Sequence, residues 1–429
     1  MIRQGDVVTL PKLGSAWRVQ ELLGQGGQGS VHLVRAVDGS QRQLALKWYA
    51  PSKVMKAQHA AITALVQRGS PSPAFLWPID IVSAPDSFGY VMPLRPPGFV
   101  GLGDLLRGRV DVGIGTALRI CVGLSDAFLQ LHSLGLCYRD ISLGNIMFDP
   151  TDGRVIICDN DNVGLDGTEG VVLGTRRFMA PEIVRGEAFP GIQTDLHSLA
   201  VMIFYVLMIG HPLLGRREGN YPCIDETAER ELFGDKALFV FDPASAANAP
   251  DPVEQETMIA NWEVLPDHVR AQFIRAFTTG LVHPGERVRE SAWRKDLSGA
   301  LDRVVGCPGC AAENAVAQDA TSRCWHCGTA LSADLTVVIG RSRVLVGLGG
   351  QVTQHHLRHD YAVCRPVGIF VRHPQRHVWG LRNVGATHWR ATIPGRDPVE
   401  VPPERAIAMV PGTSVDFGGV TGRVESPAH

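Results

Sequence analysis

Hydrophobic and polar positions alternate in short stretches over the first 95 residues of the chain. Alternation with a period of two is typical of β-strands with one buried face. The pattern predicts strands at residues 17–23, 30–35, 44–49, 79–83 and 90–92. Residues 53–68 instead have the apolar spacing of a helix. The beginning of the chain is therefore predicted to form a mostly β domain with one helix.

The pattern changes twice farther along the chain. Residues 111–134 and 194–208 have the length and apolar periodicity of helices, so the region from about 100 to 305 is predicted to be mostly helical. From residue 335 onward, short Val-rich runs alternate with Gly and Pro, which is typical of an all-β fold. The whole chain is thus expected to be α+β.

Composition and charge limit the number of domains and the kinds of partner that the chain is expected to have. The 429 residues suggest two or three domains, and a net charge of −2 gives no reason to expect nucleic acid or an anionic membrane as a partner. The first ten residues lack the apolar core of a signal peptide, and the longest apolar run, 199–209, is too short to span a bilayer. We therefore expect a cytoplasmic protein in a reducing compartment, without structural disulfides.

A glycine-rich segment lies between the first two predicted strands. It has the pattern G-x-G-x-x-G-x-V, formed by Gly24, Gly26, Gly29 and Val31, with a further glycine at Gly27. Glycines let the backbone approach a polyphosphate closely and donate its N–H groups. A dinucleotide-binding turn would lead into a helix, whereas the β-branched residues after this segment predict a strand. The motif favours a phosphate-binding hairpin, and by itself is also compatible with a flexible hairpin that binds nothing.

Lys47 lies in the apolar run that also contains Ala45, in the third predicted strand. A buried lysine needs a negatively charged partner, because an unpaired buried charge is costly. Phosphate oxygens of a bound nucleotide would supply that partner. An edge-strand lysine that faces water is the alternative.

Three further polar residues follow at intervals suited to phosphoryl transfer. Asp140 and Asn145 stand five residues apart after a predicted helix, and Asp159 ends the apolar run 156–158. Phosphoryl transfer needs a carboxylate to orient the attacking hydroxyl and oxygen ligands for Mg²⁺. Asp140 suits the first role, and Asn145 and Asp159 suit the second.

These motifs resemble, in order and spacing, those of the protein kinase family over about 290 residues. The resemblance implies a bilobal kinase fold, with an N-lobe at 1–95 and a C-lobe at 96–305, that uses ATP and Mg²⁺ to phosphorylate Ser/Thr hydroxyls of a protein. The segment GTRRFMAPE at 174–182 is similar to the family's substrate-docking loop. Four residues would then support the site: Thr175 beside Asp140, Asp195 steadying the catalytic loop, and Glu182 paired with Arg287.

Several positions depart from the family pattern. Tyr138 replaces a histidine, Ser142 replaces a lysine, and Asn160-Asp161 replaces Phe-Gly after the metal-binding aspartate. The helix at 53–68 contains no glutamate, and Gln58 stands where the partner of the strand lysine is expected. These changes keep open a nucleotide-binding pseudokinase scaffold as the alternative to an enzyme.

The segment between the metal-binding aspartate and residue 180 is short. Thr168 and Thr175 are its only hydroxyl residues, and the resemblance gives Thr175 a structural role. Thr168 is therefore the only obvious phosphorylation site, and we expect weak control by phosphorylation of this segment.

Four of the nine cysteines form two C-x-x-C pairs separated by 13 residues: Cys307, Cys310, Cys324 and Cys327. Such turns direct two thiolates each toward one tetrahedral metal, so residues 306–331 are predicted to be a zinc ribbon with a structural Zn²⁺. Disulfides or a redox dithiol are the alternatives. The remaining five cysteines are expected in the core: Cys121, Cys137, Cys158, Cys223 and Cys364.

Residues 332–429 are predicted to form a β-sandwich. This segment loosely resembles the forkhead-associated domain, which binds phosphothreonine, although the family's Ser-x-x-His and Asn-Gly signatures are not evident. An Ig-like sandwich for protein contact is the alternative. His355, His356 and His359 are interpreted as exposed strand residues, with a metal site as the alternative.

The order of kinase, zinc ribbon and forkhead-like domain resembles that of bacterial kinases associated with a von Willebrand A protein and a metal-dependent protein phosphatase. This resemblance implies those two proteins as partners in a signalling module.

Overall fold

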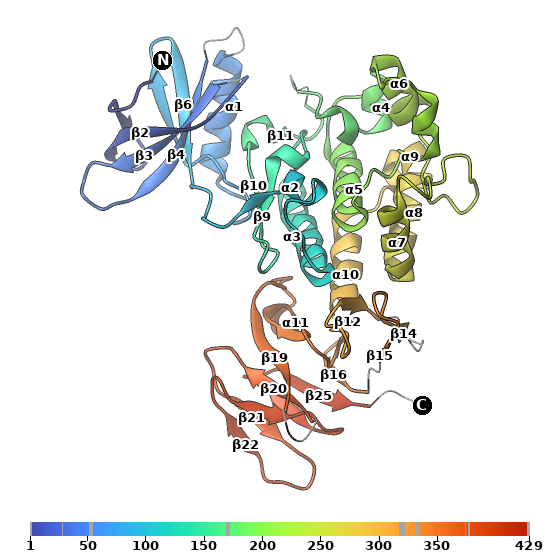
Figure 1. The fold of residues 1–429 in the computed structure, drawn as a ribbon. Helices are drawn as coiled ribbons and strands as arrows, with labels where there is room; N and C mark the ends of the chain where they lie inside the picture. Colours follow the sequence, from blue (N-terminus) through green and yellow to red (C-terminus); the bar gives the residue numbers. More distant parts are fainter. Residues whose placement is uncertain are drawn as a thin grey trace. The chain divides into compact units, whose positions relative to one another are not determined.

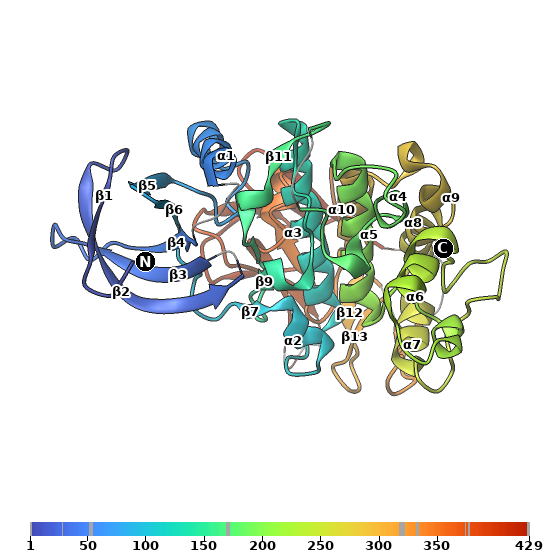
Figure 2. The ribbon, with the colours of Figure 1, turned by 90° about the horizontal axis from the view of Figure 1, so that it is seen from above.

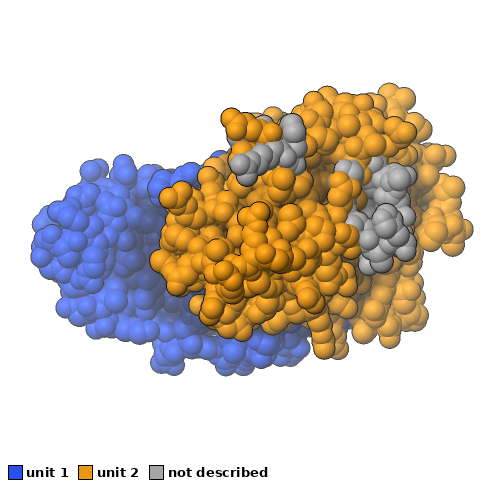
Figure 3. All heavy atoms as spheres, turned by 90° about the horizontal axis from the view of Figure 1, so that it is seen from below, with its two compact units in different colours: residues 1–102, 127–148, 155–198 blue, residues 103–126, 149–154, 199–429 orange. Residues whose placement is uncertain are grey.

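The computed structural model describes residues 2–27, 29–50, 55–168, 172–316, 322–331, 334–373, 375 and 378–426. The chain forms two compact units, which Figure 3 colours separately. The first comprises residues 1–102, 127–148 and 155–198, and the second comprises residues 103–126, 149–154 and 199–429.

The first unit begins with an antiparallel six-stranded sheet in the order β1-β2-β3-β4-β6-β5 (Figure 2). Its strands are β1 (Val7–Leu10), β2 (Ser15–Gly26), β3 (Gly29–Ala36), β4 (Gln43–Tyr49), β5 (Asp80–Ala84) and β6 (Ser87–Met92). Helix α1 (Met55–Arg68) contacts β5 and β6. Trp17, Val34 and Leu46 belong to the core of the sheet, whose apolar positions face inward as the alternating pattern predicts.

Two small sheets in the same unit carry the polar loops. Strands β7 (Val100–Gly101), β9 (Ile146–Phe148) and β10 (Val155–Ile157) form one sheet, and β8 (Leu136–Cys137) pairs with β11 (Gly164–Leu165). Residues 138–145 connect β8 to β9, and residues 158–163 connect β10 to β11. These connections contain the short helices η1 (Leu143–Asn145) and η2 (Asn160–Asn162), and η3 (Arg176–Phe178) and α4 (Pro181–Val184) follow.

Helices dominate the next part of the chain (Figure 1). They are α2 (Leu102–Leu106), α3 (Ile114–Ser133), α5 (Ile192–Met208), η4 (Arg216–Asn220), α6 (Glu226–Arg230), η5 (Glu231–Asp235), α7 (Glu256–Val264), α8 (Asp267–Phe277), α9 (Thr279–Val282), η6 (Pro284–Glu286) and α10 (Glu290–Leu301). Phe204, Phe273 and Trp293 form part of an aromatic core between α5, α8 and α10. Helix α3 is long and apolar enough to cross a membrane, but 67% of its most apolar stretch is buried, as in a core helix.

The second unit ends in two β modules. The first has two hairpins, β12 (Val304–Gly306) with β13 (Glu313–Ala315) and β14 (Ser322–Arg323) with β15 (Ala330–Leu331). The second has a six-stranded sheet, β17-β16-β25-β24-β21-β22, and a four-stranded sheet, β18-β19-β20-β23, around a shared core that includes Leu381 and Trp389. Its elements are β16 (Thr336–Ile339), β17 (Ser342–Leu345), β18 (Gln351–Thr353), α11 (Gln354–Arg358), β19 (Pro366–Arg372), β20 (Trp379–Asn383), β21 (Trp389–Thr392), β22 (Val399–Val401), β23 (Ala406–Ala408), β24 (Ser414–Asp416) and β25 (Thr421–Glu425).

Two predictions about side chains are wrong. His355 and His356 are not exposed strand residues but are buried in α11, where Thr353 and His356 form a capping box and the His356 Nε2 lies 2.8 Å from the Asp302 Oδ1. Cys223 is exposed, because it lies in the turn-rich segment between η4 and α6, whereas the other four scattered cysteines are buried or half-buried.

Candidate active site

The glycine-rich segment forms the tight turn between β2 and β3. Gly26 pairs with Gly29, and a side chain at Gly29 would bring its Cβ within 2.0 Å of the Trp48 carbonyl oxygen. A Cβ at Gly24, Gly26 or Gly27 would meet nothing within 4 Å. Packing therefore requires only the last glycine, and the other three leave an open backbone that a phosphate group can approach.

Lys47 lies on β4, where the strand register places it opposite Val31 of β3. Its side chain is 9% exposed, and its Nζ donates hydrogen bonds to Asp159 and, over 2.7 Å, to the Asp161 Oδ2. Burial alone would lower the pKa of Lys47, but the two carboxylates raise it above its ordinary value. The neighbouring Ala45 is buried and pairs with Met92 of β6.

Among the described residues, Lys47 does not form the expected hydrogen bond with Gln58. Gln58 of α1 instead hydrogen-bonds to the Tyr49 hydroxyl, and that hydroxyl in turn donates to Asp161. Burial of Tyr49 and the Asp161 carboxylate raise the pKa of the phenol above its ordinary value. The lysine thus has two acidic partners, both from the β10–β11 connection.

The loop between β8 and β9 brings the predicted catalytic residues together. The Asn145 Nδ2 donates to the Asp140 carbonyl oxygen at 2.9 Å and to its Oδ2 at 3.3 Å. The Thr175 hydroxyl donates to the Asp140 Oδ1 at 2.7 Å, as the resemblance implied. Since the Cys158 N–H also donates to the Asn145 carbonyl at 2.8 Å, the loop is joined to the residue that precedes Asp159.

Asp195 of α5 fixes the start of this loop. Its Oδ1 accepts from the Arg139 N–H at 2.9 Å, its Oδ2 accepts from the Tyr138 N–H at 2.5 Å, and the His132 Nε2 lies 3.1 Å from the same Oδ2. Arg139 has a left-handed backbone with a φ of 74°. Such a conformation costs about 1–3 kcal/mol in a non-glycine residue, so bonds to a buried carboxylate are needed to hold it.

Asp159 combines a left-handed backbone, with a φ of 53°, and crowded negative charge. Burial and the adjacent Asp161 carboxylate raise the pKa of Asp159, and Lys47 only partly opposes them. The Asp161 Oδ1 is buried without a hydrogen-bond partner among the described residues. Excess negative charge with oxygen ligands at hand fits a divalent cation, and Asp159 and Asn145 would be its protein ligands.

Arg139 contacts the one predicted phosphorylation site. Its Nη2 donates to the Thr168 Oγ1 at 2.7 Å and to the Thr168 carbonyl oxygen at 2.9 Å. Tyr138, in the position of the family's histidine, is buried, donates its hydroxyl to the Cys158 carbonyl oxygen and packs edge-on against Phe128. Ser142 is buried as well.

Glu182 is buried in α4, and the buried Arg287 donates from its Nε to the Gly280 carbonyl oxygen at 3.0 Å. The first residue belongs to the first unit and the second to the second unit. Their pairing stays a prediction.

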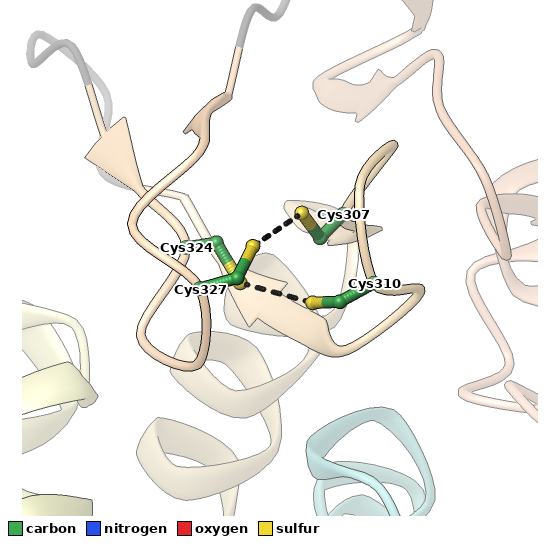
Figure 4. A group of neighbouring side chains, drawn as sticks. All are labelled: Cys307, Cys310, Cys324 and Cys327. Atoms are coloured by element: carbon green, nitrogen blue, oxygen red, sulfur yellow. Dashed lines mark hydrogen bonds between the residues drawn. The ribbon is translucent and has the colours of Figure 1, made fainter.

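The four clustered cysteines form a separate candidate site in the second unit (Figure 4). All four Sγ atoms lie within 4.8 Å of one another, with 3.5 Å between Cys307 and Cys327 and 3.6 Å between Cys310 and Cys324. A tetrahedral zinc site with Zn–S bonds of about 2.3 Å separates its sulfurs by about 3.8 Å. The residues present therefore fit a Zn²⁺ ion.

Backbone N–H groups in both C-x-x-C turns point at sulfur. The Gly309 N–H donates to the Cys307 Sγ at 3.3 Å, and the His326 N–H donates to the Cys324 Sγ at 3.4 Å. Burial would raise the pKa of Cys324, but N–H donors from Cys327 and His326 outweigh it and lower the pKa to about 6. The second turn thus favours thiolates, the form that binds metal.

Known protein kinases resemble part of the chain. It is 30% identical over 213 residues to CBL-interacting protein kinase 4 of Oryza sativa subsp. japonica, an alignment that covers 47% of this chain and 46% of that protein. It is 28% identical over 214 residues to mouse protein kinase C delta type, with 46% and 30% covered, and 26% identical over 204 residues to CBL-interacting serine/threonine-protein kinase 13 of Arabidopsis thaliana, with 46% and 39% covered. The chain spans less than half the length of each of these relatives.

A family model described as "Protein kinase domain" matches residues 17–255, more than half of the chain. The match includes the glycine turn, Lys47, both polar loops and Asp195. The match agrees with the predicted α+β kinase fold, since an antiparallel sheet precedes a mostly helical region. The chain therefore belongs to the protein kinase domain family.

Proposed function

We propose that this protein is an ATP-dependent protein kinase that transfers the γ-phosphoryl group to Ser or Thr hydroxyls of a protein substrate. One observation carries the proposal: Lys47, Asp140, Asn145 and Asp159, distant in sequence, belong to one hydrogen-bonded network in one unit. The name of the Arabidopsis relative, a serine/threonine-protein kinase, favours Ser/Thr over other acceptors.

The nucleotide would be held by backbone and lysine. The glycine turn leaves open space in which its backbone N–H groups would donate hydrogen bonds to phosphate oxygens, and Lys47 would supply a positive charge beside them. Mg²⁺, when bound, neutralises charge on the phosphates and orients them. Asp159 and Asn145 would hold that ion, whose positive charge would offset the crowded Asp159 and Asp161 carboxylates.

Asp140 would act on the protein substrate. Its carboxylate orients the substrate hydroxyl and accepts its proton as the oxygen attacks the γ-phosphorus. Thr175 and Asn145 each donate one hydrogen bond to this carboxylate, which fixes its direction. Asp195 maintains the loop backbone through the Tyr138 and Arg139 amides.

The experiment is a transfer assay with ATP labelled at the γ-phosphate. Purified protein with Mg²⁺ and a generic protein substrate should place label on phosphoserine or phosphothreonine after acid hydrolysis. The rival function is a pseudokinase scaffold, favoured by Ser142 and Asp161 at positions where the family has other residues. Thermal stabilisation by Mg-ATP without any labelled amino acid would support the scaffold and overturn the proposal.

We also propose that the cysteine cluster is a structural zinc ribbon. The four sulfurs complete a tetrahedral set, so no position is left for a reactive water. Zinc content close to one ion per chain, lost in Cys310→Ser but kept in Cys223→Ser, would support this assignment. Equal zinc content in both variants would contradict it.

For the C-terminal sandwich we propose a forkhead-associated-like role in binding phosphothreonine segments, within a signalling module that includes a von Willebrand A protein and a metal-dependent phosphatase. The proposal extends the sequence resemblance, and the two-sheet sandwich is compatible with it. Retention of the full chain on phosphothreonine peptides, but not on the unphosphorylated ones, would support it. Equal retention on both would favour a plain protein-contact domain. A cytoplasmic location belongs to the same proposal.

A further inference from the structure

The lysine of the nucleotide site lacks its usual partner. In protein kinases this strand lysine forms an ion pair with a glutamate of the helix that follows, and movement of that helix makes or breaks the pair. Helix α1 of this chain, MKAQHAAITALVQR, has no acidic residue, so α1 offers Lys47 no carboxylate at all. Another group must hold the lysine in the direction of the phosphates.

In this structure, Asp161 supplies a carboxylate that pairs with Lys47. Its side chain is 0% exposed, and its Oδ2 accepts from the Lys47 Nζ at 2.7 Å and from the Tyr49 hydroxyl. Tyr49 lies two residues beyond Lys47 on β4, so its side chain is on the same face of the strand. Among the described residues, Gln58, at the position of the missing acid, interacts with the Tyr49 hydroxyl, whereas Lys47 bonds to Asp159 and Asp161.

Asn160, the residue before Asp161, also fixes the position of residues 159–161. This residue is 0% exposed, and its Nδ2 donates to the Leu76 carbonyl oxygen at 2.9 Å and to the Ile157 carbonyl oxygen at 3.2 Å. A phenylalanine, which the family has here, can swing between apolar pockets, whereas an amide with two buried acceptors loses both bonds if it leaves. Residues 159–161 are thereby fixed inward.

We propose that Asp161 is the positioning residue that orients Lys47 toward the nucleotide phosphates, in place of the helix glutamate of other kinases. Lys47 is then aligned by Asp161 and Asp159 of the segment 159–161, and its alignment does not depend on the position of α1. Displacement of α1 does not switch this site off, since α1 carries no partner for the lysine. This inference rests on the proposed kinase function, but its test has a binding readout that is independent of phosphoryl transfer.

The test uses the full chain with Asp161→Gly, Gln58→Glu and the double variant. Glycine is the family residue at position 161, and glutamate is the family residue at position 58, so the double variant rebuilds the usual pair. The first readout is the Kd of a fluorescent ATP analogue with magnesium withheld by EDTA, which reports lysine–phosphate contact without the metal. The second is kcat and KM for Mg-ATP.

Asp161→Gly should weaken metal-free nucleotide binding by about tenfold, and the double variant should recover most of that loss, since the two acids substitute for each other. Gln58→Glu alone should not improve binding, because Lys47 already has two carboxylate partners. Asp161→Asn keeps the hydrogen-bonding shape without the charge. It should fold like the wild type by circular dichroism and show an intermediate loss, which keeps the test usable if the glycine variant unfolds.

Two results would overturn the inference. In the first, the double variant binds nucleotide no better than Asp161→Gly, which would make Asp161 a merely structural residue. In the second, metal-free binding is unchanged in Asp161→Gly while the Mg²⁺ requirement rises, which would make Asp161 a metal ligand. Absence of phosphoryl transfer in every variant, together with the expected Kd pattern, would instead contradict the proposed function and leave the role of Asp161 intact.

Discussion

The two polar clusters of this protein are assembled in opposite ways. The catalytic cluster gathers Lys47, Asp140, Asn145, Asp159 and Asp161 from three separate parts of the chain, and hydrogen bonds between distant residues hold it. The cysteine cluster uses two short turns within residues 307–327, and local N–H···S bonds shape each turn. The first cluster is organised by the surrounding fold, whereas the second brings four thiols together around a point that a metal ion fits.

This difference explains why the catalytic cluster tolerates departures from the family pattern. A lost helix glutamate can be replaced by a carboxylate from another segment, because many elements border the same buried space. A lost cysteine has no such replacement, because a tetrahedral site needs its fourth ligand at one position. Removing a component should therefore affect the cysteine cluster most strongly and most locally.

The largest effect is expected from zinc removal. Structural zinc contributes about 10 kcal/mol or more to the folding of small metal modules, so a strong chelator should unfold residues 306–331. Hydrogen exchange of the β12–β15 hairpins should rise to that of an unfolded chain, while kcat for phosphoryl transfer should change by less than about threefold. Protected hairpins after complete zinc loss would show that packing alone holds the cluster, and loss of phosphoryl transfer would show that the two clusters are coupled.

A smaller effect is expected from Asp195→Ala. This change leaves the buried Tyr138 amide and the partly buried Arg139 amide without an acceptor, and an unsatisfied buried group costs about 1–3 kcal/mol. Urea unfolding should show a loss of about 3 kcal/mol, together with reduced kcat. Asp195→Asn, which keeps one acceptor oxygen, should lose less. A change below about 0.5 kcal/mol in Asp195→Ala would mean that the loop backbone is held by other contacts.

The smallest effect is expected from Glu313→Gln, which tests how the cysteine module is joined to its own unit. The Glu313 Oε2 accepts from the Gly115 N–H at 2.8 Å, at the first turn of α3. A carboxylate there also interacts with the helix dipole, so its neutralisation should cost about 1 kcal/mol. Glu425→Gln is the matched control, because Glu425 forms an exposed pair with Arg343 at 3.3 Å, and such pairs contribute little. Equal losses of stability in both variants would show that the Glu313–Gly115 hydrogen bond makes no specific contribution.

Local sequence patterns predict much of the secondary structure and the cysteine cluster. The strands around the glycine turn and the long helices α3 and α5 follow from periodicity, and the structure has them within a few residues of the predicted bounds. The C-x-x-C turns also bring the four sulfurs together, because each turn is a local structure. Lys47 is buried and pairs with a carboxylate, as its place in an apolar strand predicts, because an unpaired buried charge is costly. The domain boundaries stay predictions.

Features that depend on long-range packing could not be read from the chain. The interpretation of Gln58 as the lysine's partner was wrong, because the choice between Gln58 and Asp161 is made where β4 meets the β10–β11 connection. Helix α11 has only five residues, too few for a periodic pattern, so the sequence wrongly predicts a strand at His355 and His356. Tyr49 offered one signal that was missed, since it follows Lys47 by two residues on the same strand face.

The central claim is that the network of Lys47, Asp140, Asn145 and Asp159 transfers phosphate, and Asp140→Asn tests it most directly. The variant keeps the shape of the side chain but removes the group that accepts the substrate proton. The account predicts that label transfer from γ-labelled ATP falls by about 10²–10⁴-fold, with the Kd for Mg-ATP unchanged within about threefold. Equal label transfer by Asp140→Asn and the wild type would contradict the account.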